Sequence, residues 1–117
     1  MKEKTKILIA ESEQIIADDL QLMLENSGHT IVATVSTREE AIKKVKMLEP
    51  DIVIMNIYLS GKIEGKSTAK QIKKFSKTLI MFYSTCKDTQ TINDIQALTD
   101  TPVINPNKLL FGLDLEK

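Results

Sequence analysis

The feature that most constrains this chain is a short apolar run, Asp51-Ile-Val-Ile-Met-Asn56, which begins directly after Pro50. Its four central residues are all apolar, without the alternation of a half-exposed strand. A strand that is covered on both faces shows this pattern, which is typical of the centre of a parallel sheet. Ligands and chemistry gather just beyond the carboxyl ends of such strands. Asn56, the first polar residue after the run, therefore occupies the place where a functional side chain is expected.

Strand-like and helix-like segments alternate along the whole chain. Gly28 predicts the left-handed end of the first helix, Thr37 and Glu40 predict a capping box for the second, and the loop 57–65 carries two glycines that indicate turns. Pro102 cannot donate to a ladder, which places the last strand at an edge of the sheet. Five strands are predicted, at 6–10, 30–35, 52–55, 79–83 and 101–105. Each is followed by a predicted helix. The apolar faces of these five helices are expected at Ile16–Leu24, Ala41–Leu48, Ala69–Phe75, Ile92–Leu98 and Leu109–Leu113.

This alternation predicts one doubly wound α/β domain over residues 1–117, with a parallel five-stranded sheet, right-handed crossovers and helices on both faces. The fifth helix is expected to be short, because Gly112 interrupts it and the chain ends five residues later. The turns that follow strands one, three, four and five should converge on one end of the sheet.

Charge and cysteine content narrow the function classes. The 16 basic and 16 acidic residues cancel, which argues against a general affinity for nucleic acid or for a membrane surface. Cys86 is the only cysteine, so no internal disulfide can form, and a reducing cytoplasm is the expected compartment. The apolar stretch near the amino terminus is too short for a signal peptide or a membrane span.

The chain resembles the receiver domain of two-component response regulators over nearly its full length. The residues that carry this resemblance are Ile7-Leu-Ile-Ala-Glu-Ser-Glu-Gln-Ile-Ile-Ala17, Glu39-Glu-Ala-Ile42, Pro50-Asp-Ile-Val-Ile-Met-Asn-Ile-Tyr-Leu59 and Glu64-Gly65. The resemblance implies a flavodoxin-like fold with sheet order 2-1-3-4-5. It also implies a pocket in which an aspartate, helped by Mg²⁺, takes a phosphoryl group from a histidine kinase.

Most of the residues that this pocket requires are replaced here. The phosphoacceptor aspartate of the family falls on Asn56. The family's acidic pair, which holds Mg²⁺, falls on Glu11 and Ser12. The hydroxyl residue after the fourth strand falls on Ser84 and is retained in type. The lysine after the fifth strand falls on Asn105, with Pro106 retained. These residues form a vestigial pocket if the resemblance holds.

The replacements remove charge from three parts of one reaction. The amide of Asn56 is neutral and a poor nucleophile, unlike the aspartate that forms an acyl phosphate. One carboxylate, Glu11, makes at best a weak Mg²⁺ site, and Asn105 offers a dipole where a lysine would neutralise phosphoryl oxygens. A hydrogen-bonded cluster of Ser12, Asn56 and Asn105 is expected instead. We therefore expect no catalytic residues, no metal site and no cofactor, and a naturally degenerate receiver that is not an enzyme.

Other interpretations of these residues remain open. Ser12 is alternatively the N-cap of the first helix, and Glu11 and Glu13 are alternatively ordinary acids of its first turn. An active receiver could use Ser60, Ser84 or Glu11 as its acceptor. A flavodoxin-like nucleotide or flavin binder is a third hypothesis, although the loops lack a glycine-rich phosphate cradle.

The expected partner is another signalling protein, a histidine kinase or a regulator, or a second copy of the chain. Contact is expected through the face between the fourth and fifth helices, because a short last helix would leave apolar residues uncovered.

Overall fold

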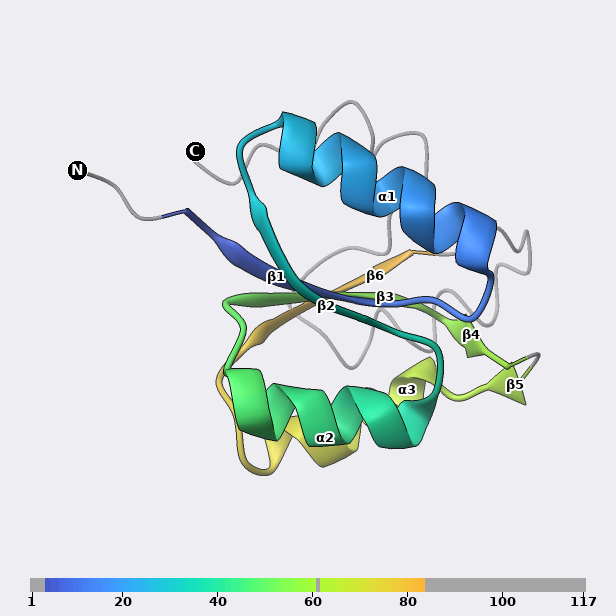
Figure 1. Cartoon of the computed structure of the whole chain (residues 1–117). Helices are drawn as coiled ribbons and strands as arrows, with labels where there is room; N and C mark the ends of the chain where they lie inside the picture. The colour runs from blue at the N-terminus through green and yellow to red at the C-terminus, as the bar shows by residue number, and fades with distance from the viewer. Residues whose placement is uncertain (1–3, 61, 84–117) are drawn as a thin grey trace.

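The computed structural model describes residues 4–60 and 62–83, which form an open parallel sheet with helices on both faces (Figure 1). The sheet runs in the order β2 (Thr30–Val35), β1 (Lys6–Ala10), β3 (Ile52–Asn56) and β6 (Leu79–Tyr83), and all three strand pairs are parallel. This confirms the predicted α/β class and the order of the first four parallel strands. The predicted fifth strand and the fourth and fifth helices lie outside the described residues.

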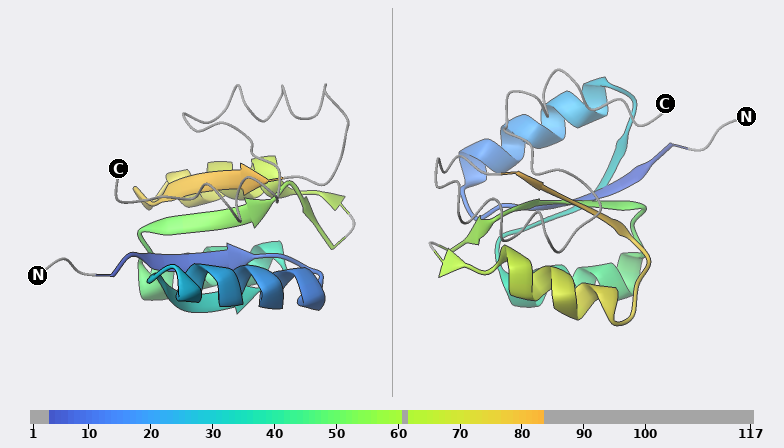
Figure 2. Two further views of the ribbon diagram at one scale, coloured as in Figure 1. Left: turned by 90° about the horizontal axis from the view of Figure 1, so that it is seen from above. Right: turned by 180° about the vertical axis from the view of Figure 1, so that it is seen from behind.

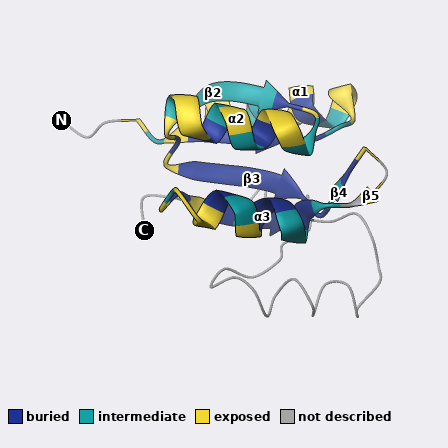
Figure 3. Ribbon diagram, turned by 90° about the horizontal axis from the view of Figure 1, so that it is seen from below, coloured by how far each residue is buried: buried dark blue, intermediate teal, exposed yellow. Residues whose placement is uncertain are grey.

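The helices are divided between the two faces of the sheet. Helix α1 (Gln14–Asn26) covers one face, and α2 (Arg38–Leu48) and α3 (Gly65–Lys73) lie side by side on the other (Figures 1 and 2). Every residue of β3 is buried, as the unbroken apolar run predicts (Figure 3). Among the described residues, no helix is both long enough and apolar enough to cross a bilayer.

Side chains of the central strands alternate between two cores. Ile7, Ile9 and Ile54 pack with Leu20 and Leu24 under α1. The intervening residues of the same strands pack under α2 and α3 with Val45, Ala69 and Ile72. Each fully buried aliphatic side chain contributes roughly 1.5–3 kcal/mol. The two cores hold β1, β3 and β6 in register, which fixes the positions of the residues at the carboxyl ends of these strands.

Two helix ends follow the local sequence signals. Gly28 lies in the left-handed region at φ 94, and the His29 N–H donates to the Leu24 carbonyl over 3.0 Å, which ends α1 as predicted. At the start of α2, the Glu40 N–H donates to the Thr37 hydroxyl over 3.2 Å, which confirms Thr37 as the N-cap, and the Glu40 carboxylate reaches back to accept the Ser36 N–H over 3.4 Å.

The start of α1 differs from the expectation for Ser12. The N-cap residue is Glu13, in an extended conformation and without a side-chain cap bond, so the prediction of Ser12 as N-cap was wrong. Glu11 and Glu13 also lie before the first turn and not in it. The Glu13 N–H donates to Glu11 Oε2 over 2.9 Å, and this contact keeps the chain extended so that the helix begins at Gln14.

The segment after β3 is more ordered than the predicted loop. Two short antiparallel strands, β4 (Tyr58–Leu59) and β5 (Lys62–Ile63), form a hairpin that leads into α3. Gly65 is the first residue of α3 and no turn glycine: a Cβ there would lie 3.0 Å from the backbone of Ile57 and 3.1 Å from the Phe82 ring. Close approach of two backbones, more than turn geometry, explains this glycine.

The end of α3 also corrects one prediction. Phe75 was expected on the buried face of the helix, but α3 ends at Lys73 and the Phe75 side chain is 41% exposed. The Phe75 ring instead makes a cation–π contact with Lys46, whose ammonium lies 4.9 Å from the ring centroid.

Candidate functional site

The strand register brings three polar side chains to the same end of the sheet. Ile7 of β1 pairs with Ile52 of β3, which pairs with Leu79 of β6, and two residues later the row is Ile9, Ile54 and Met81. Because side chains of a strand alternate between faces, each second row points toward α1. The next row in that series, at the carboxyl ends of the strands, is Glu11, Asn56 and Tyr83.

These three side chains form one buried hydrogen-bond network. Asn56 Nδ2 donates to Glu11 Oε1 over 2.9 Å, and the Tyr83 hydroxyl donates to the same oxygen. The other carboxylate oxygen accepts the Glu13 N–H. Glu11 is only 2% exposed, Asn56 7% and Tyr83 0%. Both oxygens of a buried carboxylate are thus satisfied by donors of the protein itself, as a buried charge requires.

Both ends of the Asn56 amide are engaged. Its Nδ2 faces the Glu11 carboxylate, and its Oδ1 accepts the Tyr58 N–H over 3.0 Å. The opposite amide orientation would set oxygen against oxygen and N–H against N–H, so the network fixes which atom is which. Asn56 therefore links the loop after β1 to the turn that leads into β4.

Burial raises the pKa of the Tyr83 hydroxyl far above its usual range, and the hydrogen bond to Glu11 and the negative charges of Glu11 and Glu13 raise it further. Each of these causes disfavours a phenolate beside a carboxylate. Tyr83 is therefore a neutral phenol that donates to Glu11 at any physiological pH.

The donor set does not fit the Mg²⁺ ion that the resemblance implies. Mg²⁺ requires near-octahedral oxygen ligands, normally with one or two carboxylates. Here the carboxylate of Glu11 already accepts three hydrogen bonds, and the amide oxygen of Asn56 faces a backbone N–H. Nor do three His, Cys, Asp or Glu side chains gather at any metal-binding spacing within residues 4–60 and 62–83.

The remaining candidate residues divide into those that the structure describes and those that it does not. Ser12 is half-buried, and its hydroxyl makes no hydrogen bond with the described part of the chain. Asn56 donates to Glu11 instead, so the expected contact between Ser12 and Asn56 does not form. Ser60, the alternative acceptor, is exposed beyond β4 at φ 54 and donates to the Ser36 carbonyl over 3.4 Å. Ser84, Asn105 and Pro106 lie outside the described residues.

Tyr83 is the member of the network that sequence reasoning missed. The sequence pattern makes Tyr83 the last residue of an apolar strand, and the family resemblance points to the hydroxyl of Ser84 instead. A signal was present, because counting rows of two from Ile52 and Leu79 puts Asn56 and Tyr83 side by side. A tyrosine hydroxyl at the buried end of a strand needs a partner, and the Glu11 carboxylate lies on the same row.

Comparisons with known proteins agree with this architecture. The family model described as "Response regulator receiver domain" matches residues 7–101. The alkaline phosphatase synthesis transcriptional regulatory protein PhoP of Bacillus subtilis is 34% identical over 83 residues, which cover 71% of this chain and 34% of that protein. The transcriptional regulatory protein YdfI of the same organism is 31% identical over 81 residues, covering 68% of this chain and 38% of that protein.

Among solved structures, the signal receiver domain of a modulated diguanylate cyclase from Desulfovibrio desulfuricans G20 superposes with a TM-score of 0.77. It is 22% identical and covers 98% of this chain and 100% of that one, a likeness that shows the fold. The chain spans between a third and two fifths of the length of the two curated relatives.

Proposed function

This chain belongs to the family of response regulator receiver domains, and from that premise we propose that it is a receiver that does not accept phosphate and acts as a non-catalytic protein-interaction module. Receiver domains of two-component systems work through contact with other signalling proteins. The observation that carries the proposal is the closed network of Glu11, Asn56 and Tyr83, which engages the side chains at the acceptor position and at the surviving acidic position.

The first support is the chemistry at position 56. Nucleophilic attack on phosphorus needs an oxygen with available electron density, which an aspartate supplies. The Asn56 oxygen belongs to a neutral amide and already accepts a backbone N–H. Attack by that oxygen would break this bond and the bond from Nδ2 to Glu11, and it would form no stable acyl phosphate.

The second support is the state of the Glu11 carboxylate. A divalent cation at Glu11 would have to replace the Tyr83 hydroxyl, the Asn56 amide and the Glu13 N–H as partners of a carboxylate that is 2% exposed. Hydrogen bonds to a charged group contribute roughly 1.5–3 kcal/mol each. The same satisfied carboxylate argues against Glu11 as an alternative phosphoacceptor.

The proposed partner is another signalling protein, a histidine kinase or a regulator, or a second copy of the chain. The face between the fourth and fifth helices, where contact is expected, lies outside the described residues. The curated relatives are longer than this chain and are named as transcriptional regulators. Any output domain and any effect on transcription would be a property of a longer protein.

The experiment incubates the chain with acetyl phosphate and Mg²⁺ and measures its intact mass. The native chain should gain no phosphoryl group. A matched variant restores the family's charged residues with Asn56→Asp, Ser12→Asp and Asn105→Lys, and a second adds Tyr83→Phe to free Glu11. Phosphorylation of the restored variants, strongest where Tyr83 is also replaced, would support the proposal.

Modification of the native chain, mapped to any residue by peptide sequencing, would overturn it. Ser60 would then be tested by Ser60→Ala, because its exposed position would make it the accessible acceptor.

A further inference from the structure

The solvent-facing side of α1 carries two large apolar side chains. Ile15 is 79% exposed and Leu22 is 59% exposed. They are seven residues apart, so both lie on one line along the helix, about 10 Å from each other. Asp18 and Asp19 are exposed between them on the same side, and these four residues form the α1 stripe. A surface with two apolar anchors and acidic residues between them fits an apolar groove that is flanked by cations.

An open groove of about 460 Å³ lies on the solvent-facing side of α2. Its lining residues, which form the α2 groove, are Glu39, Ile42, Lys43, Lys46 and Met47. Met47 is 61% exposed, and Ile42 is half-buried against the core beneath the helix. The two lysines add the aliphatic stems of their side chains to the lining while their ammonium groups stay in water. The α2 groove is therefore apolar inside and carries a net positive charge at its edges.

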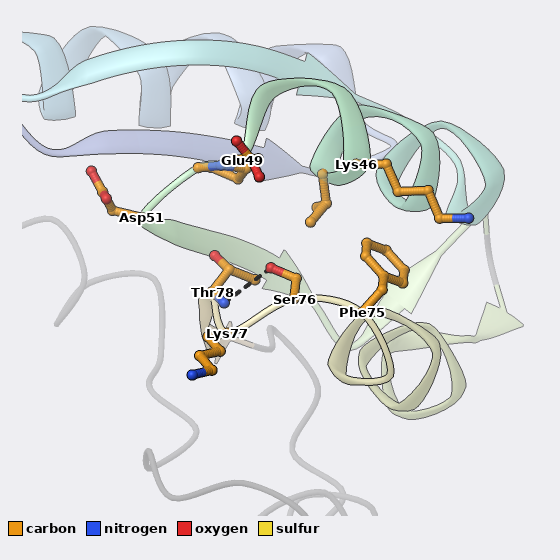
Figure 4. A pocket seen from close by; sticks show the side chains of 9 residues that line it. Lys46, Glu49, Asp51, Phe75, Ser76, Lys77 and Thr78 are labelled. Atoms are coloured by element: carbon orange, nitrogen blue, oxygen red, sulfur yellow. Dashed lines mark hydrogen bonds between the residues drawn. The ribbon is translucent and has the colours of Figure 1, made fainter.

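The lysines of the α2 groove are not neutralised by the protein itself. The Lys46 ammonium lies 4.9 Å from the centroid of the Phe75 ring, and Figure 4 shows the two side chains next to each other. Neither Lys43 nor Lys46 forms an ion pair with an acidic side chain in the described part of the chain. Both ammonium groups are therefore available to an anionic group from outside the molecule.

The two faces of the sheet carry opposite charge, although the chain as a whole is neutral. Helix α1 has three acidic residues and no basic one. Helices α2 and α3, on the other face, together have seven basic residues and two acidic ones (Figure 1). No acidic residue of α1 pairs with a lysine or arginine among residues 4–60 and 62–83. The neutral total therefore hides a molecule with two oppositely charged faces, which are complementary between copies.

From these observations we propose that the chain associates with itself head to tail, with the α1 stripe of one copy docked in the α2 groove of the next. The apolar side chains of the stripe would enter the groove, and its two aspartates would meet the two lysines. A second copy is the partner that fits, because every copy offers both a stripe and a groove of matching apolar character and opposite charge.

The contact is heterologous, because it joins two different surfaces. The stripe and the groove lie on opposite faces of the sheet, so a pair of copies still has one free stripe and one free groove (Figures 1 and 2). Association of this kind is open-ended unless the rotation between copies closes a ring. It is distinct from a dimer through the face between the fourth and fifth helices, and it does not depend on whether Asn56 accepts phosphate.

The test measures the weight-average mass of the full chain by analytical ultracentrifugation, up to a protein concentration of about 1 mM. Both surfaces are small and exposed ion pairs contribute little, so a dissociation constant on the order of 0.1–1 mM is expected at low salt. The mass should rise with concentration and should not level off at that of a dimer. Salt at about 0.5 M, where the Debye length is roughly 4 Å, should weaken the association several-fold.

Two double variants each disable one of the two surfaces. Asp19→Asn with Leu22→Gln disables the stripe, and Lys43→Gln with Met47→Gln disables the groove. All four positions are exposed, so the melting temperature should stay within about 3 °C of that of the native chain. Each variant alone should be monomeric. An equal mixture should form a 1:1 complex that grows no further, because the intact groove of one variant meets the intact stripe of the other.

The matched control removes two positive charges from the same face without touching the groove. Lys70→Gln with Lys74→Gln changes exposed residues of α3 and of the position that follows it. This variant should associate within about twofold of the native chain, because long-range attraction between exposed charges is screened by salt.

Four results would overturn the proposal. The native chain could remain monomeric at about 1 mM, which would leave both surfaces to other partners. A dimer of fixed size could persist in both double variants, which would place the contact elsewhere on the chain. The mixture of the two variants could be no larger than either alone, which would exclude a contact between stripe and groove. The control could weaken association as much as the groove variant does, which would indicate a general effect of charge.

Discussion

Replacing Tyr83 by phenylalanine tests the buried network most sharply, because it removes one hydroxyl and changes nothing else in the side chain. The loss leaves Glu11, a carboxylate that is 2% exposed, with one donor fewer. A hydrogen bond to a buried charged group contributes roughly 1.5–3 kcal/mol. For a chain of 117 residues, an unfolding entropy of about 2.1 cal/mol/K per residue converts this to a melting temperature lower by roughly 6–12 °C.

The assay is urea unfolding at pH 7, followed by far-UV circular dichroism, on the native chain and on Tyr83→Phe. The matched control is the same change in a Glu11→Gln background. There the Tyr83 hydroxyl donates to a neutral amide, so its removal should lower the free energy of unfolding by clearly less. A change in unfolding free energy below about 0.5 kcal/mol for Tyr83→Phe would refute the reasoning, because surface substitutions alone reach that size.

The raised pKa of Tyr83 adds a pH dependence to the same prediction. The folded state holds the phenol proton more tightly than the unfolded state, whose pKa is near 10.0. The stabilising contribution of the protonated Tyr83 phenol to the free energy of unfolding is therefore fully present below pH 10. It is lost as the pH rises toward the pKa of the folded state, by about 1.4 kcal/mol per pH unit. The native chain should lose stability above pH 10 more steeply than Tyr83→Phe. Equal alkaline slopes in the two proteins would show that Tyr83 ionises freely.

Three further substitutions test separate parts of the structure. Asn56→Asp places a second carboxylate against Glu11, so we expect lower stability at pH 7 and partial recovery near pH 5, measured by thermal unfolding at both values. Gly65→Ala sets a Cβ 3.0 Å from the backbone of Ile57, which cannot yield as a side chain would, and overpacking of this kind costs about 1–3 kcal/mol in urea unfolding. Thr37→Ala removes the cap of α2 and should cost about 1 kcal/mol, whereas Thr37→Ser should cost much less.

The sequence was sufficient for the strands and for the first two residues of the network. Unbroken apolar runs point to β1, β3 and β6, because strands covered on both faces show this pattern, although Leu79 at the start of β6 is 42% exposed. Glu11 and Asn56 then follow as the first polar residues after two adjacent strands, and the structure places them 2.9 Å apart.

The remaining features depend on register and on tertiary contacts, which local patterns do not report. Tyr83 lies at the end of an apolar run, and only its pairing with Asn56 reveals that its hydroxyl faces the carboxylate. In the sequence, Phe75 continues the helical spacing of apolar residues in α3, yet the helix ends two residues earlier, at Lys73. Gly65 resembles a turn glycine until the backbone of Ile57 is seen against it.

The central claim is that the Glu11 carboxylate is satisfied by the protein and has no need of a cation. A crystal structure of the native chain grown with Mg²⁺ and beryllofluoride tests it most directly. We predict that Asn56 and Tyr83 still donate to Glu11 and that no ion is ordered beside them. An ordered Mg²⁺ bound to Glu11, with beryllofluoride next to residue 56, would contradict the account.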